Sequence, residues 1–305
     1  MADAREGLSE QRAKEDDVIV VTGATGKLGR LVIDALLQRV PAAELAVGVR
    51  TPSKTADLAA QGVQVRHADY DRPETLPGAF KPGEKVLLIS ANEVGKRAAQ
   101  HLRVIEAARA ANVGLLAYTS LLRADRSTLI LAEEHRTTEE AIRASGLPYV
   151  LLRYGWYIEN HTEQLDGIVE RGEIVGAAAA GRFASAARRD YAAAAAAVLA
   201  ADGVASTVYE LTGDGFTLEE FAAEVTKQSG KRIVYSNLTP EQYKEALAAS
   251  GMPVAIADLV ADFDRAAAQG DLDGSSDDLR RLIRRPATSL RDAIAGALKD
   301  LVPAH

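Results

Sequence analysis

The stretch Val18-Ile-Val-Val-Thr-Gly-Ala-Thr-Gly-Lys-Leu-Gly29 organises the rest of the chain. It opens with β-branched apolar residues, and such a run predicts a strand that is buried on both faces. Gly23, Gly26 and Gly29 follow at a spacing of three. From Arg30 to Gln38 apolar residues recur at helical spacing, so we predict that the glycines lie at a strand-to-helix turn.

A strand–turn–helix unit with glycines in its turn is typical of dinucleotide-binding folds. The glycines permit a tight turn, a close approach of the backbone to pyrophosphate, and close packing of helix on strand. The helix N-terminus adds unpaired N–H groups and the positive end of its dipole. The spacing Gly-x-x-Gly-x-x-Gly is a variant of the usual pattern and is a weak signal alone. In this context it predicts a cofactor site, with a purely structural turn as the alternative.

Composition limits the class of protein. The 305 residues carry a net charge of -7, which argues against nucleic acid or an anionic membrane as the main partner. The chain has no cysteine, so it has neither disulfides nor thiolate chemistry. No apolar run is long enough to span a bilayer, and we expect a cytoplasmic protein. Residues 1–16 are polar and of mixed charge, which predicts a disordered N-terminal extension.

Strands and helices alternate through the first half of the chain. After the first unit, strands are expected at 44–50, 63–67, 85–90, 114–120 and 149–153, and helices at 51–60, 95–111 and 132–145. This alternation predicts an α/β fold with a Rossmann-type, doubly wound parallel sheet. We expect an NAD(P)-binding domain over 17–155 and a smaller α-rich lobe over 156–305 that is not fully independent, with the ligand in the crevice between them. Residues 172–186, rich in Gly and Ala, are interpreted as a loop.

Arg50 ends the second expected strand, at the position that distinguishes the two nicotinamide cofactors. An Asp or Glu there would bind the ribose 2′-hydroxyl of NAD. Arg50, with Lys54 close behind it, suits the 2′-phosphate of NADP instead. The sequence therefore favours NADP, and the alternative is a solvated arginine at a strand end.

Polar residues follow the next strands as well. Asp69 could accept a hydrogen bond from the adenine amino group and Tyr70 could cover the ring, although Asp also commonly supplies a turn. Ser120 ends the fifth expected strand, where it could lie near the nicotinamide or cap a turn. The fourth strand leads to a set of predicted contacts with the central part of the cofactor: Ser90, Ala91 and Asn92.

A carbonyl-protonating Tyr-x-x-x-Lys pair is absent, because no lysine has a tyrosine four residues before it. Leu131 and His135 stand where that pair would be expected. The absence disfavours an alcohol or ketone reductase. A quinone accepts hydride readily and can take its proton from water. His135 could orient a ribose or polarise a quinone oxygen, or it could be a helix-surface histidine.

An aromatic cluster follows the sixth expected strand. The segment Arg153-Tyr-Gly-Trp-Tyr157 contains the only tryptophan, and Glu159-Asn160-His161 comes after it. Such a cluster can stack on nicotinamide and on a flat substrate, although core packing would also explain it. Trp156, Tyr157 and Asn160 are the candidate substrate contacts, and Tyr157 joins His135 as a candidate catalytic residue. The sequence shows no metal-binding cluster, P-loop or nucleophile elbow.

Several motifs together resemble one family. They are Thr22-Gly-Ala-Thr-Gly-Lys-Leu-Gly29, Leu88-Ile-Ser90, Ala117-Tyr-Thr-Ser-Leu121, Gly155-Trp-Tyr157 with Glu159-Asn160, Ala184-Ser-Ala186 with Asp190-Tyr-Ala-Ala-Ala194, and Val225-Thr-Lys-Gln-Ser-Gly-Lys231. From Val18 to about Leu298 the chain is similar to bacterial NAD(P)H:quinone oxidoreductase type 2, an atypical short-chain dehydrogenase/reductase of the NmrA-like group. The first motif is shared by the whole group, and the later ones are more specific.

The resemblance implies reduction of a small-molecule quinone by NADPH, without flavin or metal, and a possible homodimer. It implies pyrophosphate contacts at Gly23, Ala24, Thr25, Gly26, Lys27 and Leu28, and a 2′-phosphate contact at Arg50. Further cofactor contacts are implied at Ser90 to Asn92, Tyr154, Gly155, Trp156, Tyr157, Glu159 and Ser185. Relatives often have Asn in place of Tyr154. A redox sensor that binds dinucleotide without turnover is the alternative, but the aromatic cluster favours the enzyme.

Overall fold

The computed structural model describes residues 18–203 and 206–301, so the expected extension over 1–16 lies outside the described residues. The chain divides into two compact units. The described residues of unit 1 fall within Met1–Leu121, Glu134–Arg153 and Ala192–Tyr209. Those of unit 2 fall within Leu122–Glu133, Tyr154–Tyr191 and Glu210–His305.

A seven-stranded sheet with the order β10-β6-β5-β4-β1-β2-β3 forms the centre of the Rossmann fold. Its strands are β1 (Ile19–Thr22), β2 (Leu45–Val49), β3 (Gln64–His67), β4 (Lys85–Leu88), β5 (Leu115–Leu121), β6 (Tyr149–Tyr154) and β10 (Thr207–Leu211). β1 pairs in parallel with both β2 and β4, β2 with β3, and β4 with β5. The chain runs outward from β1 to β3 and then crosses back to β4, so the strand order switches between β1 and β4, where ligands of this fold bind.

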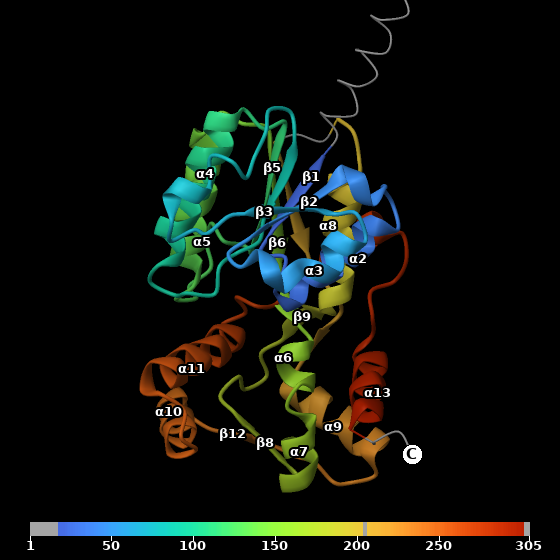
Figure 1. Ribbon diagram of the computed structural model, residues 1–305. Helices are drawn as coiled ribbons and strands as arrows, with labels where there is room; N and C mark the ends of the chain where they lie inside the picture. The colour runs from blue at the N-terminus through green and yellow to red at the C-terminus, as the bar shows by residue number, and fades with distance from the viewer. Residues whose placement is uncertain (1–17, 204–205, 302–305) are drawn as a thin grey trace, which may run out of the picture. The chain divides into compact units, whose positions relative to one another are not determined.

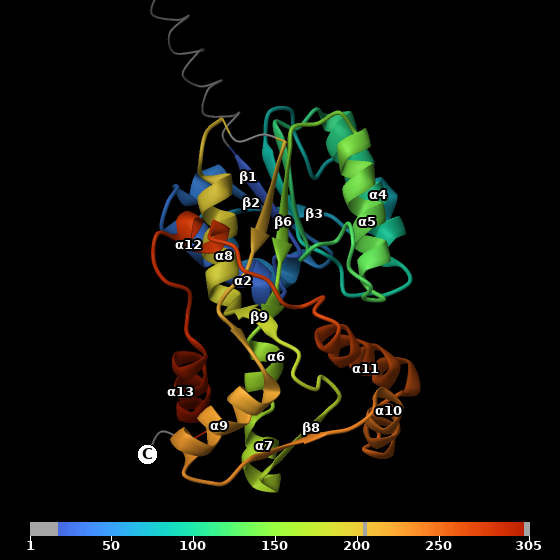
Figure 2. The same ribbon diagram turned by 180° about the vertical axis from the view of Figure 1, so that it is seen from behind.

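Helices cover both faces of this sheet. α4 and α5 lie together on one face, and α2 and α8 lie on the other (Figures 1 and 2). The helices are α2 (Lys27–Leu37), α3 (Ala56–Ala60), α4 (Arg97–Ala111), α5 (Ala132–Ala144) and α8 (Arg188–Leu199), with short 3-10 turns η1 (Ala42–Glu44), η2 (Pro52–Thr55) and η3 (Pro73–Thr75). The predicted α/β fold with a doubly wound sheet is therefore confirmed.

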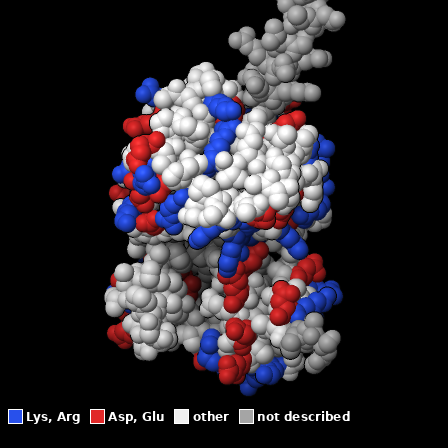
Figure 3. All heavy atoms as spheres, viewed as in Figure 1, with Lys and Arg blue, Asp and Glu red and all other residues white. Residues whose placement is uncertain are grey.

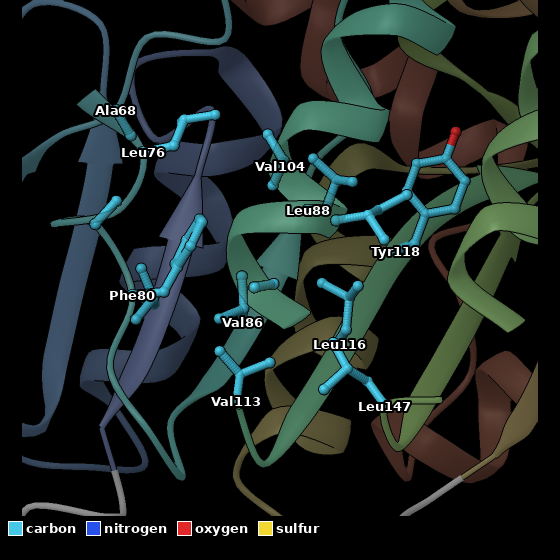
Figure 4. Packing of buried hydrophobic residues seen from close by; sticks show 14 of the residues in the cluster. Ala68, Leu76, Phe80, Val86, Leu88, Val104, Val113, Leu116, Tyr118 and Leu147 are labelled. Atoms are coloured by element: carbon cyan, nitrogen blue, oxygen red, sulfur yellow. The ribbon is translucent and has the colours of Figure 1, made fainter. Parts of the chain in front are cut away.

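One core cluster packs β4 and β5 against α4 and the segment after β3. Figure 4 shows Val86, Leu88, Leu116 and Tyr118 among its members, with the Tyr118 hydroxyl at the outer end of the ring. Every residue of β1 and β2 is buried, as expected for strands covered on both faces. Burial on both faces explains why these strands are continuous apolar runs.

Unit 2 contains two small sheets and several helices. The sheets are β11-β9-β7 and β12-β8. The strands are β7 (Trp156–Tyr157), β8 (Glu173–Gly176), β9 (Phe183–Ala186), β11 (Gly215–Phe216) and β12 (Val234–Asn237). The helices are α6 (Glu159–Thr162), α7 (Leu165–Arg171), α9 (Leu218–Ser229), α10 (Pro240–Ala249), α11 (Val254–Ala268), α12 (Asp278–Ile283) and α13 (Leu290–Asp300). The sequences Thr217-Leu-Glu-Glu220 and Thr239-Pro-Glu-Gln242 each predict a capping box, and both boxes are formed.

The interpretation of 172–186 as a loop was wrong, because this segment contains β8 and β9. Its small residues serve close packing. A Cβ atom built at Gly176 would lie 2.7 Å from a carboxylate oxygen of Asp264, and one at Gly181 would collide with the backbone of Ala267. Small side chains therefore mark tight contacts with α11 here, which composition alone does not distinguish from a loop.

The surface carries charged side chains of both signs. Figure 3 shows Lys and Arg together with Asp and Glu on the face that it presents, so that face is not dominated by charges of one sign.

Among residues 18–203 and 206–301, no helix combines the length and apolar character that crossing a bilayer requires.

Candidate active site

The glycine turn joins β1 to α2 with each glycine in a different role. Gly23 has a φ of +62°, in the left-handed region that favours glycine. Its carbonyl accepts a hydrogen bond of 3.0 Å from the N–H of Gly26. A Cβ atom at Gly29 would collide with the Gly23 carbonyl and lie 2.8 Å from the Cα of Ala24. Gly29 therefore lets helix and strand pack closely, while Gly23 makes the turn.

The N-terminus of α2 is suited to an anion. Gly26 is its N-cap residue, no side chain caps the helix, and its first turn has no acidic residue. Gly23, Thr25, Gly26 and Lys27 are exposed. Backbone N–H groups and the positive end of the helix dipole are thus open to a phosphate group.

Arg50 follows β2 directly, and its side chain is exposed. It makes no hydrogen bond or ion pair with any other residue that the structure describes. Arg30 of α2 is already engaged, since its guanidinium binds Asp57 at 2.6 Å and the Lys54 carbonyl at 2.9 Å. The hydrogen bond from Arg30 lowers the pKa of the Asp57 carboxyl. Arg50 is therefore the guanidinium at this strand end that is available to a ligand.

The segment after β3 forms the turn that its aspartates suggested. Asp69 Oδ1 accepts a hydrogen bond of 3.1 Å from the Asp71 N–H. Of the two roles considered for Asp69, this is the one in which its side chain stabilises a turn. Tyr70 is half-buried, and its buried hydroxyl has no hydrogen-bond partner among the described residues. Burial raises the pKa of Tyr70 to about 12, so its hydroxyl stays protonated and can donate.

The segment after β4 lies next to the glycine turn. A Cβ atom at Gly23 would lie 3.3 Å from the Cβ of Ile89, and the Ile89 N–H donates to Thr22 Oγ1 at 3.2 Å. The Ser90 N–H donates to Thr119 Oγ1 at 2.9 Å, and Ser90 itself is only partly buried. The structure thus brings Ser90 beside the turn, as the parallel sheet requires of the carboxyl ends of β1 and β4.

His135 is buried, so the alternative of a helix-surface histidine was wrong. It is 7% exposed, and 2.7 Å separates its Nδ1 from the hydroxyl of Tyr118 on β5. Burial, with the nearby Arg97 charge, lowers the pKa of His135 to about 3, so the ring is neutral at neutral pH. The buried face of α5 carries polar residues such as His135 and Glu139, so the polarity of the helix sequence does not show which face packs against the sheet.

Sequence reasoning missed a buried ion pair one turn further along α5. Glu139 binds Arg153 of β6 through two contacts, of 2.8 Å and 2.7 Å, and accepts a 2.6 Å hydrogen bond from Ser120. The Ser120 hydroxyl is therefore bound to a carboxylate inside unit 1. An arginine within the apolar run of β6 was the available signal, because a buried charge needs a partner.

Aromatic rings gather after β6 in unit 2. Tyr154 is buried and stacks on Tyr191, with ring centroids 4.5 Å apart. Tyr157 meets both rings edge-on, at 6.3 Å from Tyr154 and 5.5 Å from Tyr191, and the Arg188 guanidinium lies 4.9 Å from its ring centroid. Burial raises the pKa of Tyr157 well above its usual range, which disfavours it as an acid at neutral pH.

Trp156 packs in a second group of rings in the same unit. Its ring centroid lies 4.8 Å from that of Phe263 and 6.3 Å from that of Phe183. Its buried indole N–H has no partner among the described residues. Glu159 is occupied, since both of its carboxylate oxygens accept from the Arg188 N–H, and Asn160 is half-buried.

Unpartnered buried atoms test whether these residues suit a ligand. Ser185 lies on β9 and is 2% exposed, yet its hydroxyl has no partner among the described residues. The same holds for the Tyr70 hydroxyl and the Trp156 N–H. An unsatisfied buried polar group is costly unless a ligand or water meets it. Each of these groups, Tyr70 in unit 1 and Trp156 and Ser185 in unit 2, is therefore suited to a hydrogen bond with a polar ligand such as a dinucleotide. Within 18–203 and 206–301, no cluster of His, Asp or Glu could hold a metal ion.

Comparisons with known proteins agree with this geometry. Residues 23–202 match the family model described as NAD(P)H-binding. Quinone oxidoreductase 2 of Escherichia coli is 48% identical over 279 residues, which cover 91% of this chain and 98% of that protein. The solved structure of an Escherichia coli NADPH-dependent quinone oxidoreductase complexed with NADPH has a TM-score of 0.90, covering 92% of this chain and 100% of that one. The Citrobacter triphenylmethane reductase complexed with NADP(H) has a TM-score of 0.88 at 38% identity, covering 92% and 99%.

The match to the family model and the sheet define an NAD(P)H-binding protein of the Rossmann class. Within that class, the chain belongs to the bacterial NAD(P)H:quinone oxidoreductase type 2 family of the NmrA-like group.

Proposed function

We propose that this protein transfers hydride from NADPH to a quinone. The observation that carries the proposal is the exposed N-terminus of α2 at Gly26, which no side chain caps, together with the Arg50 guanidinium after β2, which no described residue engages. That pair suits the two phosphate positions of NADPH. The similarity to a quinone oxidoreductase over most of the chain supports the choice of acceptor.

Each part of unit 1 has a separate task in binding. Residues 23–28 hold the pyrophosphate through backbone N–H groups, and Arg50 meets the 2′-phosphate. The Tyr70 hydroxyl, which is buried and has no hydrogen-bond partner among the described residues, donates to the adenosine portion. Ser90, Ala91 and Asn92 contact the central part of the cofactor. In unit 2, we assign cofactor contacts to Tyr154, Gly155, Trp156, Tyr157, Glu159 and Ser185.

The quinone side needs little acid catalysis. Bound NADPH supplies the hydride, which brings two electrons and one proton. We propose that the second proton of the hydroquinone comes from solvent, because neither candidate acid suits the task. His135 is neutral and hydrogen-bonded to Tyr118, and Tyr157 has a raised pKa. Trp156, Tyr157 and Asn160 are the residues to which we assign quinone contacts.

Acceptor-dependent oxidation of NADPH tests this function. Protein purified free of flavin and treated with a chelator should oxidise NADPH with benzoquinones and naphthoquinones. A ketone and a triphenylmethane dye should be tried alongside, with a control lacking acceptor. Tight NADPH binding with no acceptor-dependent oxidation across the panel would favour a dinucleotide sensor instead. The flavin-free reaction, the homodimer and the cytoplasmic location stay predictions of the sequence.

Arg50→Ala should weaken NADPH binding about tenfold or more and leave NADH binding nearly unchanged. Hydrogen bonds to charged groups contribute roughly 1.5–3 kcal/mol each, and solvent exposure places Arg50 at the low end. About 1.4 kcal/mol corresponds to a factor of ten. Calorimetric dissociation constants for both cofactors at two salt concentrations measure the effect, and the parent should show the steeper salt dependence. Equal losses for NADPH and NADH would contradict the assignment.

Trp156→Ala should lower kcat/KM for the quinone more than it weakens NADPH binding. A favourable aromatic contact contributes about 0.5–1.5 kcal/mol beyond burial, so a loss of about threefold to tenfold is expected. Phe263→Ala is the matched control, because it removes the ring that packs on Trp156 and leaves the indole in place. If both variants lose only thermal stability, with normal turnover at low temperature, Trp156 is a packing residue.

A further inference from the structure

The segment after β4 is held by side chains rather than by the sheet. β4 ends at Leu88, so beyond the N–H of Ser90 the backbone needs other partners. The Ala91 N–H donates to His101 Nε2 at 3.0 Å, and the Ala91 carbonyl accepts from Arg97 Nε at 2.6 Å. The N–H and the carbonyl of Ala91 are therefore both bound by side chains from the first turns of α4.

We propose that His101 is a positioning residue, whose imidazole fixes Ala91 and thereby holds Ser90, Ala91 and Asn92 in the conformation that binds NADPH. The inference rests on the proposed function, because it concerns how the segment after β4 meets the cofactor. His101 does not itself touch the reacting atoms. It acts through the peptide of Ala91.

A chain of hydrogen bonds fixes the tautomer of His101. The Thr138 hydroxyl donates to the Glu134 carbonyl at 2.8 Å, so its hydrogen is not available to the imidazole. His101 Nδ1, 3.0 Å from Thr138 Oγ1, must therefore carry the hydrogen and donate. Nε2 is left with its lone pair toward the Ala91 N–H. The direction of each bond follows from its neighbour, and α5 holds the imidazole in the one state that can accept from Ala91.

Burial keeps this arrangement in place over the working pH range. His101 is fully buried, and its ring meets that of Tyr118 edge-on at 5.3 Å. Desolvation, with the nearby Arg97 charge, lowers the pKa of His101 to about 3. A protonated ring would have no lone pair for the Ala91 N–H, so the neutral state is the one that holds the segment.

A second link secures the far end of the same segment. Arg97 pairs with Glu134 of α5 at 3.2 Å, and the other carboxylate oxygen of Glu134 accepts from the Gly95 N–H at 3.1 Å. The side chains of Arg97 and Glu134 are 7% and 16% exposed. Residues 90–95 are thus fixed from α4 and α5 together, while the Asn92 side chain stays exposed.

The ring and the hydrogen bond of His101 can be tested separately. His101→Phe keeps an aromatic ring against Tyr118 but leaves the Ala91 N–H unpartnered. His101→Gln places an amide oxygen near the position of Nε2 and should restore the acceptor. We expect His101→Phe to raise the NADPH dissociation constant about tenfold, and His101→Gln to recover most of the loss. The quinone KM at saturating NADPH should change little in either variant.

The rate of amide hydrogen exchange at Ala91, measured without cofactor, reports on the hydrogen bond from Ala91 to His101. A loss of activity alone would not show whether that bond is broken. The exchange should accelerate in His101→Phe and return toward the parent rate in His101→Gln. The control is Arg66→Met, which breaks the buried Arg66–Glu84 pair of 2.7 Å before β4 begins. It should lower thermal stability without changing NADPH binding or Ala91 exchange.

Two results would overturn the inference. One is parent-like NADPH affinity and Ala91 exchange in His101→Phe. The other is an equal loss of affinity in Arg66→Met at matched stability. If His101→Phe does not fold, Thr138→Val is used, because it removes the acceptor of the Nδ1–H and frees the ring to change tautomer. An Ala91 exchange rate equal to the parent's would then contradict the proposal. Failure of the parent to bind NADPH would instead contradict the proposed function.

Discussion

NADPH binding should be lost in Gly26→Val while the fold survives. Gly26 has a φ of -79° and a ψ of 165°, extended values that valine adopts readily. A Cβ atom there would lie 3.3 Å from the Gly23 carbonyl oxygen, a contact that a small shift relieves. The valine methyl groups would instead cover the N–H groups at the start of α2. Loss of two charge-assisted hydrogen bonds, at roughly 1.5 kcal/mol or more each, predicts a decrease in affinity of about a hundredfold or more.

Gly29→Ala is the matched control for this experiment. Its Cβ atom would collide with the Gly23 carbonyl, so it should destabilise the strand–turn–helix unit itself. Calorimetry with NADPH and thermal unfolding should separate the two variants. Gly26→Val is expected to lose affinity with a small change in Tm, and Gly29→Ala to lose stability first. Parent-like affinity in Gly26→Val would exclude this turn as the phosphate site.

Glu139→Ala should lower the free energy of unfolding by about 3–5 kcal/mol, the usual cost of removing one partner of a buried ion pair. The side chains of Glu139 and Arg153 are 2% and 7% exposed, so the substitution removes a buried carboxylate that the Arg153 guanidinium contacts through two of its nitrogen atoms. It also deprives Ser120 of the oxygen to which it donates at 2.6 Å. Urea unfolding, with the slope checked for two-state behaviour, measures the loss.

Two further variants are controls for the loss of stability in Glu139→Ala. Glu139→Gln keeps an amide oxygen as acceptor and should lose less. Glu74→Ala removes the exposed pair of Arg72 and Glu74, whose side chains are 60% and 63% exposed, and should leave the free energy of unfolding nearly unchanged. Similar losses in Glu139→Ala and Glu74→Ala would show that the buried network contributes little.

The sequence by itself determined the Rossmann sheet and its glycine turn. Both follow from local signals. A doubly buried strand must be an unbroken apolar run, and a strand-to-helix turn against a phosphate requires glycine. The strand-end position of Arg50 was predictable for the same reason, because parallel strands bring their carboxyl ends to one edge. Helix starts at Thr217 and Thr239 were equally local, since a capping box satisfies backbone groups within four residues.

Only the tertiary structure decided which polar residues pair across the chain. No local pattern showed that His135 turns toward Tyr118, or that Glu139 binds Arg153. Likewise, segment 122–133 belongs to unit 2, where the Ile130 N–H donates to Asp262 and the Thr128 N–H to Asp271, each at 2.8 Å. Such contacts join residues far apart in sequence. The small residues of 172–186 resembled a loop for the same reason, because the Asp264 side chain and the Ala267 backbone that pack against Gly176 and Gly181 come from α11. Periodicity reports which face of an element is apolar, whereas the partner of a buried polar group is fixed only when the elements meet.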